Sequence, residues 1–206
     1  MKLYDSRLSG HAHRARLFLS LLGLEAELVP VDLRAGEQRG EAFRAINPFG
    51  TVPVLDDGGV LVRDSLAILV HLARLPVAGS SWLPRDPAVE VEIQTWLSRA
   101  ARDWVEGPGY ARLGTVFGAP VDVEAARQKA RRLFDTVDRH LADREWLAAG
   151  YPTIADVAAY SYTALAPEGG IALDPWPAIL AWKGRFEALP GFLPMPAAAD
   201  VLGTAR

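Results

Sequence analysis

The first 75 residues alternate short apolar runs with polar turns and segments of helical spacing, a pattern typical of a mixed α/β domain. Gly23 is typical of a helix C-terminus. Pro30 has no N–H group to donate, which places the second apolar run at a sheet edge. The predicted elements are strands over residues 2–4, 27–32, 52–55 and 60–62, helices over residues 12–22 and 66–73, and a charged, weakly helical connection over residues 34–46.

The remainder of the chain has helical spacing throughout. Residues 76–87 are rich in Pro, Gly and Ser, which indicates a linker. We expect the sequence Gly107-Pro108-Gly109 to break a helix. Helices are predicted over residues 89–104, 110–117, 124–141 and 175–189. The chain is therefore divided into an α/β domain over residues 1–75, a linker over residues 76–87 and an all-α domain over residues 88–206.

Another helix start is predicted at Thr153, because Asp156 follows three residues later. This spacing is a variant of the capping box, in which two side chains satisfy the free N–H groups of the first turn. A cap of this kind stabilises a helix by roughly 1 kcal/mol. We interpret Asp156 as a structural residue.

The segment 47–65 combines two features that suit ligand binding. Pro53 stands between two valines inside an apparent strand, and nearly all cis peptide bonds precede proline. A cis Val52-Pro53 bond would turn the peptide groups of Val52 outward, where an extended peptide can pair with them. The apolar helix that starts at Asp64-Ser65 has free N–H groups, which suit a carboxylate.

Composition excludes several classes of function. The chain has 206 residues, half of them hydrophobic, which suffices for one large or two small domains. A net charge of −3 does not indicate nucleic-acid binding. With no cysteine, the protein has no disulfide, no thiolate metal site and no cysteine nucleophile. There is no membrane-spanning apolar run and no signal-peptide pattern at the start, so we expect a cytoplasmic protein.

Segment 47–55, with the sequence NPFGTVPVL, and the Asp64-Ser65 pair at the start of a helix resemble the glutathione-binding half of cytosolic glutathione S-transferases. The resemblance implies a thioredoxin-like first domain, an all-α second domain and a homodimer. It also implies that Val52, preceding Pro53, pairs with the cysteinyl part of glutathione. Asp64 and Ser65 would hold the γ-glutamyl group, although Glu is commoner than Asp at the first of these positions.

The resemblance also suggests Ser9 as the hydroxyl that activates the thiol of glutathione. Counted back from Gly23, Ser9 falls where serine-type members carry this group, and residues 5–24 resemble bacterial members. Asn commonly follows the Ser-Gly pair there, whereas this chain has His11, which could share or replace the donor role. The alternative is that Ser9 caps the first helix, and both roles are compatible. Tyr4 is a second candidate hydroxyl, although its strand position suits the core.

Other polar residues are weaker candidates for ligand binding. Gln38 lies where some members carry a residue for the glycine carboxylate of glutathione, and Thr51 belongs to the motif itself. Arg14 and Arg39 could meet ligand carboxylates, but arginine is ordinarily a surface residue. His11 and His13 do not share a helix face, so no metal site is expected.

The second, apolar substrate should lie against the helical domain. Trp104, Tyr110 and Phe117 come from the region that resembles the family's hydrophobic-substrate wall. The alternative for each aromatic residue is a place in the helical core. A family aspartate on this helix faces the subunit interface and the γ-glutamyl amine, and Asp103 is its counterpart here.

The resemblance as a whole implies a glutathione transferase that uses glutathione as co-substrate against electrophilic apolar substrates. A glutathione-dependent isomerase, ether-cleaving enzyme or disulfide reductase is the alternative within the fold, since the same thiolate serves each reaction. A non-catalytic binding or assembly protein that retains the fold is the alternative of another class.

Overall fold

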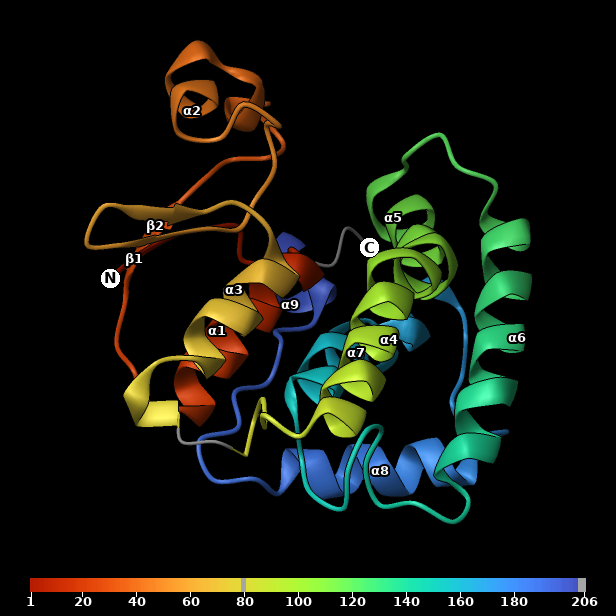
Figure 1. Ribbon diagram of the computed structural model, residues 1–206. Helices are drawn as coiled ribbons and strands as arrows, with labels where there is room; N and C mark the ends of the chain where they lie inside the picture. Colours follow the sequence, from red (N-terminus) through yellow and green to blue (C-terminus); the bar gives the residue numbers. More distant parts are fainter. Residues whose placement is uncertain (79–80, 204–206) are drawn as a thin grey trace.

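The computed structural model describes residues 1–78 and 81–203, and it has a small sheet on one side and a helical bundle on the other (Figure 1). The sheet has the order β2-β1-β3-β4. Strands β1 and β2 are parallel, and the other pairs are antiparallel. The strands are β1 (Lys2–Asp5), β2 (Glu27–Pro30), β3 (Val54–Asp57) and β4 (Val60–Val62). The predicted edge position of the second strand is confirmed.

The predicted order of strands and helices in the first domain is also confirmed, with shifted boundaries. Its helices are α1 (Gly10–Leu21), a short 3-10 turn η1 (Glu37–Arg39), α2 (Glu41–Ile46) and α3 (Ser65–Ala73). Helix α1 starts before the predicted residue 12, because Ser9 caps it. The second strand ends at Pro30 and not at residue 32, and β3 begins only after Pro53.

The rest of the described chain is helical, as predicted. Residues 79 and 80 of the predicted linker, and residues 204–206, lie outside the described residues. The helices are η2 (Pro76–Ala78), α4 (Pro87–Trp104), η3 (Val105–Gly109), α5 (Tyr110–Phe117), α6 (Val123–Leu141), α7 (Ile154–Ala164), η4 (Ala166–Gly169), α8 (Pro177–Glu187) and α9 (Ala198–Leu202).

The predicted helix break at Gly107-Pro108-Gly109 is wrong. These residues form a π-helical turn, η3, which joins α4 to α5 without an interruption. The N–H of Tyr110 reaches back five residues to the carbonyl of Val105, and this wider turn accommodates the proline. Gly107 is needed here, because a Cβ would lie 3.1 Å from the backbone of Ala130.

Helix α7 lies at the centre of the molecule, and the capping box predicted at its start is confirmed. Oγ1 of Thr153 accepts from the Ala155 N–H at 3.2 Å, and Asp156 Oδ2 accepts from the Thr153 N–H at 2.9 Å. The other oxygen of Asp156 accepts from the Leu147 N–H at 3.0 Å and from Trp182 Nε1 at 2.9 Å. Burial raises the pKa of Asp156. One carboxylate thus joins a cap, a loop and α8.

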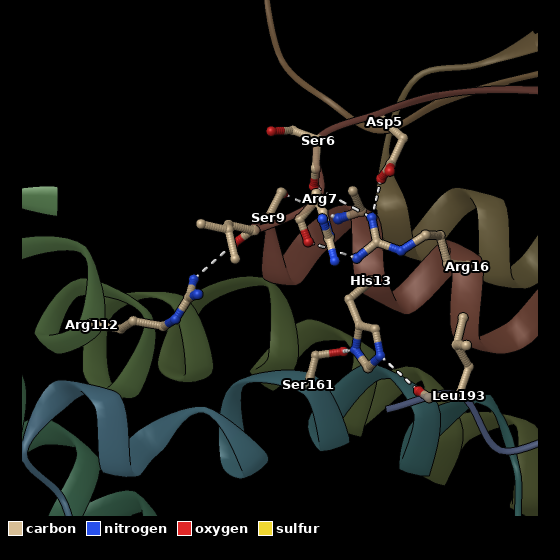
Figure 2. Close-up of polar contacts among 11 residues, drawn as sticks. Asp5, Ser6, Arg7, Ser9, His13, Arg16, Arg112, Ser161 and Leu193 are labelled. Atoms are coloured by element: carbon tan, nitrogen blue, oxygen red, sulfur yellow. Dashed lines mark hydrogen bonds and ion pairs between the residues drawn. The ribbon is translucent and has the colours of Figure 1, made fainter. Parts of the chain in front are cut away.

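Helix α1 packs against α3 and α7, and polar contacts join it to α7 (Figure 2). His13 Nδ1 lies 3.0 Å from Ser161 Oγ, and its Nε2 donates to the carbonyl of Leu193 at 2.9 Å. A Cβ at Gly10 would lie 2.8 Å from the ring of Tyr162, which explains the glycine. No helix in the described part of the chain is both long and apolar enough to cross a membrane.

The C-terminal segment runs back along α1 and then joins the helical domain. Ser20 Oγ donates to the carbonyl of Gly191 at 2.7 Å, and the contact of Leu193 with His13 follows. The N–H of Ala198 then donates to Glu168 Oε1 at 2.8 Å, at the start of α9. The segment is therefore attached at both ends.

We expect Asp156→Ala to lower the free energy of unfolding by about 3 kcal/mol or more, because it removes a cap and leaves buried donors without an acceptor. Urea unfolding measures the change. Asp135→Ala is a matched control, because Asp135 is exposed and also accepts from a tryptophan, Trp176 Nε1 at 2.8 Å. Its expected cost is about 1 kcal/mol. Equal costs for both variants would contradict the structural role of Asp156.

Candidate functional site

Three chain segments reach the same edge of the sheet. Tyr4 of β1 lies opposite Val54, and Leu55 lies opposite Val62 of β4. Val52 precedes β3 and Ser65 follows β4, so both come just beyond the end of the sheet where β1 also ends. The loop that leads to Ser9 leaves β1 at this edge. The sheet thus brings together the predicted ligand-binding segments.

The peptide bond between Val52 and Pro53 is cis, as the sequence predicts. Both residues are buried, and the N–H and carbonyl of Val52 have no hydrogen-bond partner within residues 1–78 and 81–203. The loop before them is held by Asn47, whose Nδ2 donates to the Thr51 carbonyl at 2.7 Å and to Thr51 Oγ1 at 3.2 Å. The backbone of Val52, just before β3, is therefore fixed in place, and its peptide groups are unpaired within the described residues.

Asp64 and Ser65 begin α3, and their side chains differ in environment. Asp64 is exposed and caps the helix, because its Oδ1 accepts from the Leu66 and Ala67 N–H groups at 2.8 and 3.0 Å. Ser65 is buried, and its Oγ lies 3.4 Å from both His11 Nδ1 and Arg14 Nη1. Ser65 is thus in contact with α1.

Ser9 is the N-cap of α1, and its Oγ accepts from the Ala12 N–H at 3.2 Å. The predicted capping role is therefore confirmed. The cap uses the oxygen as acceptor and leaves the hydroxyl hydrogen available for a ligand. Ser9 is partly exposed, so a ligand can reach it. The other candidate hydroxyl, Tyr4, packs edge-on against Phe43 at 6.1 Å between ring centroids.

His11 lies between the two serines. Its Nδ1 is 3.1 Å from Arg14 Nη1, and its ring meets that of Tyr162 edge-on at 5.2 Å. Burial, followed by the positive charge of Arg14, lowers the pKa of His11 to about 3. His11 is therefore neutral at pH 7.

Arg14 is fully buried, contrary to the expectation that arginine lies at the surface. Nε donates to the Ala158 carbonyl at 2.7 Å and Nη2 to the Ala100 carbonyl at 3.3 Å, so the side chain joins α1 to α7 and α4. Its guanidinium carbon lies 5.1 Å from the centre of the Tyr162 ring. No signal in the sequence distinguishes this arginine from a surface one.

Gln38 lies beside the cis-proline loop, because a Cβ at Gly50 would be 2.9 Å from the Gln38 carbonyl oxygen. Its side-chain Oε1 is buried and has no partner within the described residues. The neighbouring Arg39 is exposed. The structure therefore places Gln38 against the loop that carries Thr51 and Val52.

The predicted wall for an apolar substrate is wrong for Trp104. This residue is completely buried, and its Nε1 donates to Thr163 Oγ1 at 2.8 Å, so it belongs to the helical core. Tyr110 and Phe117 are 40% and 43% exposed and can contact a substrate. Asp103 pairs with Arg99 and Arg102 at the surface of α4.

Arg112 was not a candidate from the sequence, yet it holds the loop that precedes Ser9 (Figure 2). Nη1 donates to the Leu8 carbonyl at 2.8 Å, and Nε donates to Glu168 Oε2 at 2.5 Å. The side chain is buried, and its guanidinium carbon lies 5.2 Å from the centre of the Phe117 ring. The helical domain therefore fixes the position of the Ser9 loop.

Comparisons with known proteins agree along the whole chain. Residues 8–75 match the family model "Glutathione S-transferase, N-terminal domain", and residues 118–190 match "Glutathione S-transferase, C-terminal domain". Glutathione S-transferase 3 of Zea mays is 31% identical over 91% of this chain and 86% of its own. The crystal structure of a glutathione S-transferase from Xanthobacter autotrophicus has a TM-score of 0.88 and 32% identity, over 97% of this chain and 98% of that chain.

The match to another relative is shorter but has a higher sequence identity. Glutathione S-transferase Z2 of Arabidopsis thaliana is 49% identical over 72 residues, which are 35% of this chain and 32% of that protein. The matched part thus spans about a third of the length of this relative.

We expect the free energy of unfolding to fall by about 2 kcal/mol per buried histidine when the pH is lowered from 7 to 5. Burial lowers the pKa of His11 to about 3 and that of His13 to about 4. The unfolded chain, with a histidine pKa near 6.5, therefore binds more protons in this range, so stability decreases as the pH falls. Urea unfolding at both pH values tests this, and His13→Gln should halve the change. An unchanged pH dependence in that variant would contradict the prediction.

The effects of substituting Arg112 and Glu168 on the free energy of unfolding should be strongly coupled. We expect Arg112→Met alone to cost about 3 kcal/mol or more, because it leaves a carboxylate without its partner. The double variant with Glu168→Gln should cost clearly less than the sum of the single variants. The exposed pair of Lys129 and Glu106 provides the control cycle, with an expected coupling below about 1 kcal/mol. Equal coupling in the two cycles would contradict this prediction.

Proposed function

The chain belongs to the glutathione S-transferase family, and we propose that it is an enzyme that transfers glutathione to electrophilic apolar substrates. One observation carries the proposal. The backbone of Val52, unpaired within the described residues, comes just before β3, at the end of the sheet where β4 leads to Ser65 and the N-terminus of α3. An extended backbone pairs with the first feature, and a carboxylate suits the second. Glutathione has both groups.

We place the cysteinyl part of glutathione along Val52 and its γ-glutamyl group at Asp64 and Ser65. Oδ1 of Asp64 is used by the helix cap, so Oδ2 is the oxygen that meets the γ-glutamyl amine. Gln38 and Thr51 lie on the side of the loop where the glycine end would extend. This orientation points the thiol towards Ser9.

Ser9 then stabilises the thiolate of glutathione. A thiol with a pKa near 8.5 must lose about two units, or about 2.7 kcal/mol, to be mostly ionised at pH 7. A hydrogen bond from a hydroxyl to an anion contributes about 1.5–3 kcal/mol, and the N-terminus of α1 adds about 0.3–1 kcal/mol. These two contributions suffice, so the proton can leave to solvent without a general base in the protein.

The thiolate attacks the electrophilic carbon of the second substrate. A carbon–sulfur bond forms, and the leaving group departs with the electron pair of the bond that breaks. Tyr110 and Phe117 are the exposed aromatic residues that would contact the apolar part of this substrate. Trp104 has no part in this surface, because it lies in the core.

We further propose that the protein acts in the cytoplasm as a homodimer. A cavity of about 250 Å³ between α3 and α4 supports the second part of this proposal. Its lining is mostly apolar, with contributions from Leu66, Ala67, Val70, Gln94, Leu97, Ser98 and Ala101. An apolar depression of this kind suits the side chains of a second copy.

We expect Ser9→Ala to raise the pKa of the bound glutathione thiol by about 1–2 units, because a hydrogen bond to the thiolate is lost. The ultraviolet absorbance of the thiolate, followed against pH with saturating glutathione, measures this pKa. Ser9→Thr is the matched control, because threonine keeps the hydroxyl and also caps helices.

The result separates the functional classes. An unshifted thiol pKa in the wild type would indicate a binding protein and contradict the proposed enzyme. A shifted pKa that Ser9→Ala leaves unchanged would assign the thiolate to another donor, and His11 would then be the next residue to substitute.

A further inference from the structure

We propose that Arg14 is a positioning residue that sets the hydrogen-bond donors for the γ-glutamyl α-carboxylate of glutathione. This inference rests on the proposed function, because it concerns the same ligand. Arg14 itself lies behind the site and is completely buried. Its effect would reach the ligand through Ser65 and His11, the two side chains that it contacts on the side of the site.

The charge of Arg14 forms no close ion pair in the described part of the chain, and Asp64, the cap of α3, is the carboxylate whose charge acts on it from farther away. Within these residues no carboxylate lies within 4.0 Å of its guanidinium, and its other acceptors are the neutral carbonyls of Ala100 and Ala158. A buried charge without a counterion is costly. The cation therefore favours an anion nearby, and the N-terminus of α3, where Ser65 lies, favours an anion in the same place.

The direction of each hydrogen bond follows from the chemistry of arginine, which can only donate. Nη1 lies 3.1 Å from His11 Nδ1, so Nδ1 must be the acceptor and the neutral ring carries its hydrogen on Nε2. Nη1 also donates to Ser65 Oγ at 3.4 Å. Because His11 Nδ1 carries no hydrogen, the Ser65 hydroxyl is the donor in their 3.4 Å contact, and the donor that His11 leaves for a ligand is Nε2.

A purely structural role predicts different behaviour. Arg14 joins α1 to α4 and α7, so its loss would lower stability whatever the ligand. The two roles differ in whether the effect depends on the negative charge of the α-carboxylate. A glutathione analogue with an α-carboxamide on the γ-glutamyl residue lacks that charge and is otherwise of similar shape.

The test compares dissociation constants, by calorimetry, for glutathione and this α-carboxamide analogue. We expect Arg14→Gln to weaken the binding of glutathione about tenfold or more and that of the analogue less than about threefold. Arg14→Lys keeps the charge and should therefore weaken the binding of glutathione less than Arg14→Gln does. Arg16→Gln is the matched control on the same helix, because Arg16 pairs with Asp5 and bonds the Ser6 and Arg7 carbonyls and not Ser65, so it should affect both ligands equally.

Equal weakening of both ligands by Arg14→Gln would overturn the proposal and leave a structural role. Wild-type protein that binds neither ligand would overturn the proposed function itself. The two failures are thus distinguishable.

A second measurement needs no change at Arg14 and applies if Arg14→Gln does not fold. Nitrogen-15 NMR of the wild type at pH 7 should show His11 as the neutral tautomer with the hydrogen on Nε2, with His11→Gln used to assign its signals. A hydrogen on Nδ1, or a doubly protonated ring, would contradict the contact with Arg14 and overturn the proposal.

Discussion

The contact between α1 and α7 is the constraint on which the rest of the structure depends. Eight of the twelve residues of α1 are buried, so this helix belongs as much to the helical domain as to the sheet. The close approach of Gly10 to Tyr162 fixes its depth, and the bonds of His13 and Arg14 to α7 fix its rotation. Ser9 caps this helix, so packing in the core determines where its hydroxyl lies.

The polar groups at this contact give the site its electrostatic character. Burial keeps His11 and His13 neutral. Arg14 donates hydrogen bonds to backbone carbonyls of α7 and α4. The site thus combines neutral hydrogen-bonding groups with a buried charge behind them. In the function that we propose, a thiolate and a carboxylate would be held without direct contact with a residue that titrates near neutral pH.

The fold and the backbone part of the site could be predicted from sequence, because proline and helix caps act locally. The cis bond before Pro53 and the capping box of Thr153 and Asp156 are formed by residues close in the chain, and the structure has both as expected. Burial depends on distant partners. Trp104 takes the place in the core that its helical spacing with Ile93 and Ala100 allows, and not the place that the resemblance implies. The roles of Arg14 and Arg112 appear only when α7 and η4 are in place.

The path of the C-terminal segment has a consequence for how such proteins vary. Its carbonyl at Leu193 is the acceptor for a buried histidine, and its Ala198 N–H shares Glu168 with the arginine that holds the loop before Ser9. Under the function that we propose, sequence change in this tail would therefore alter reactivity at the opposite end of the chain without touching either substrate. Diversification of the tail would then tune activity while Ser9 itself stays the same.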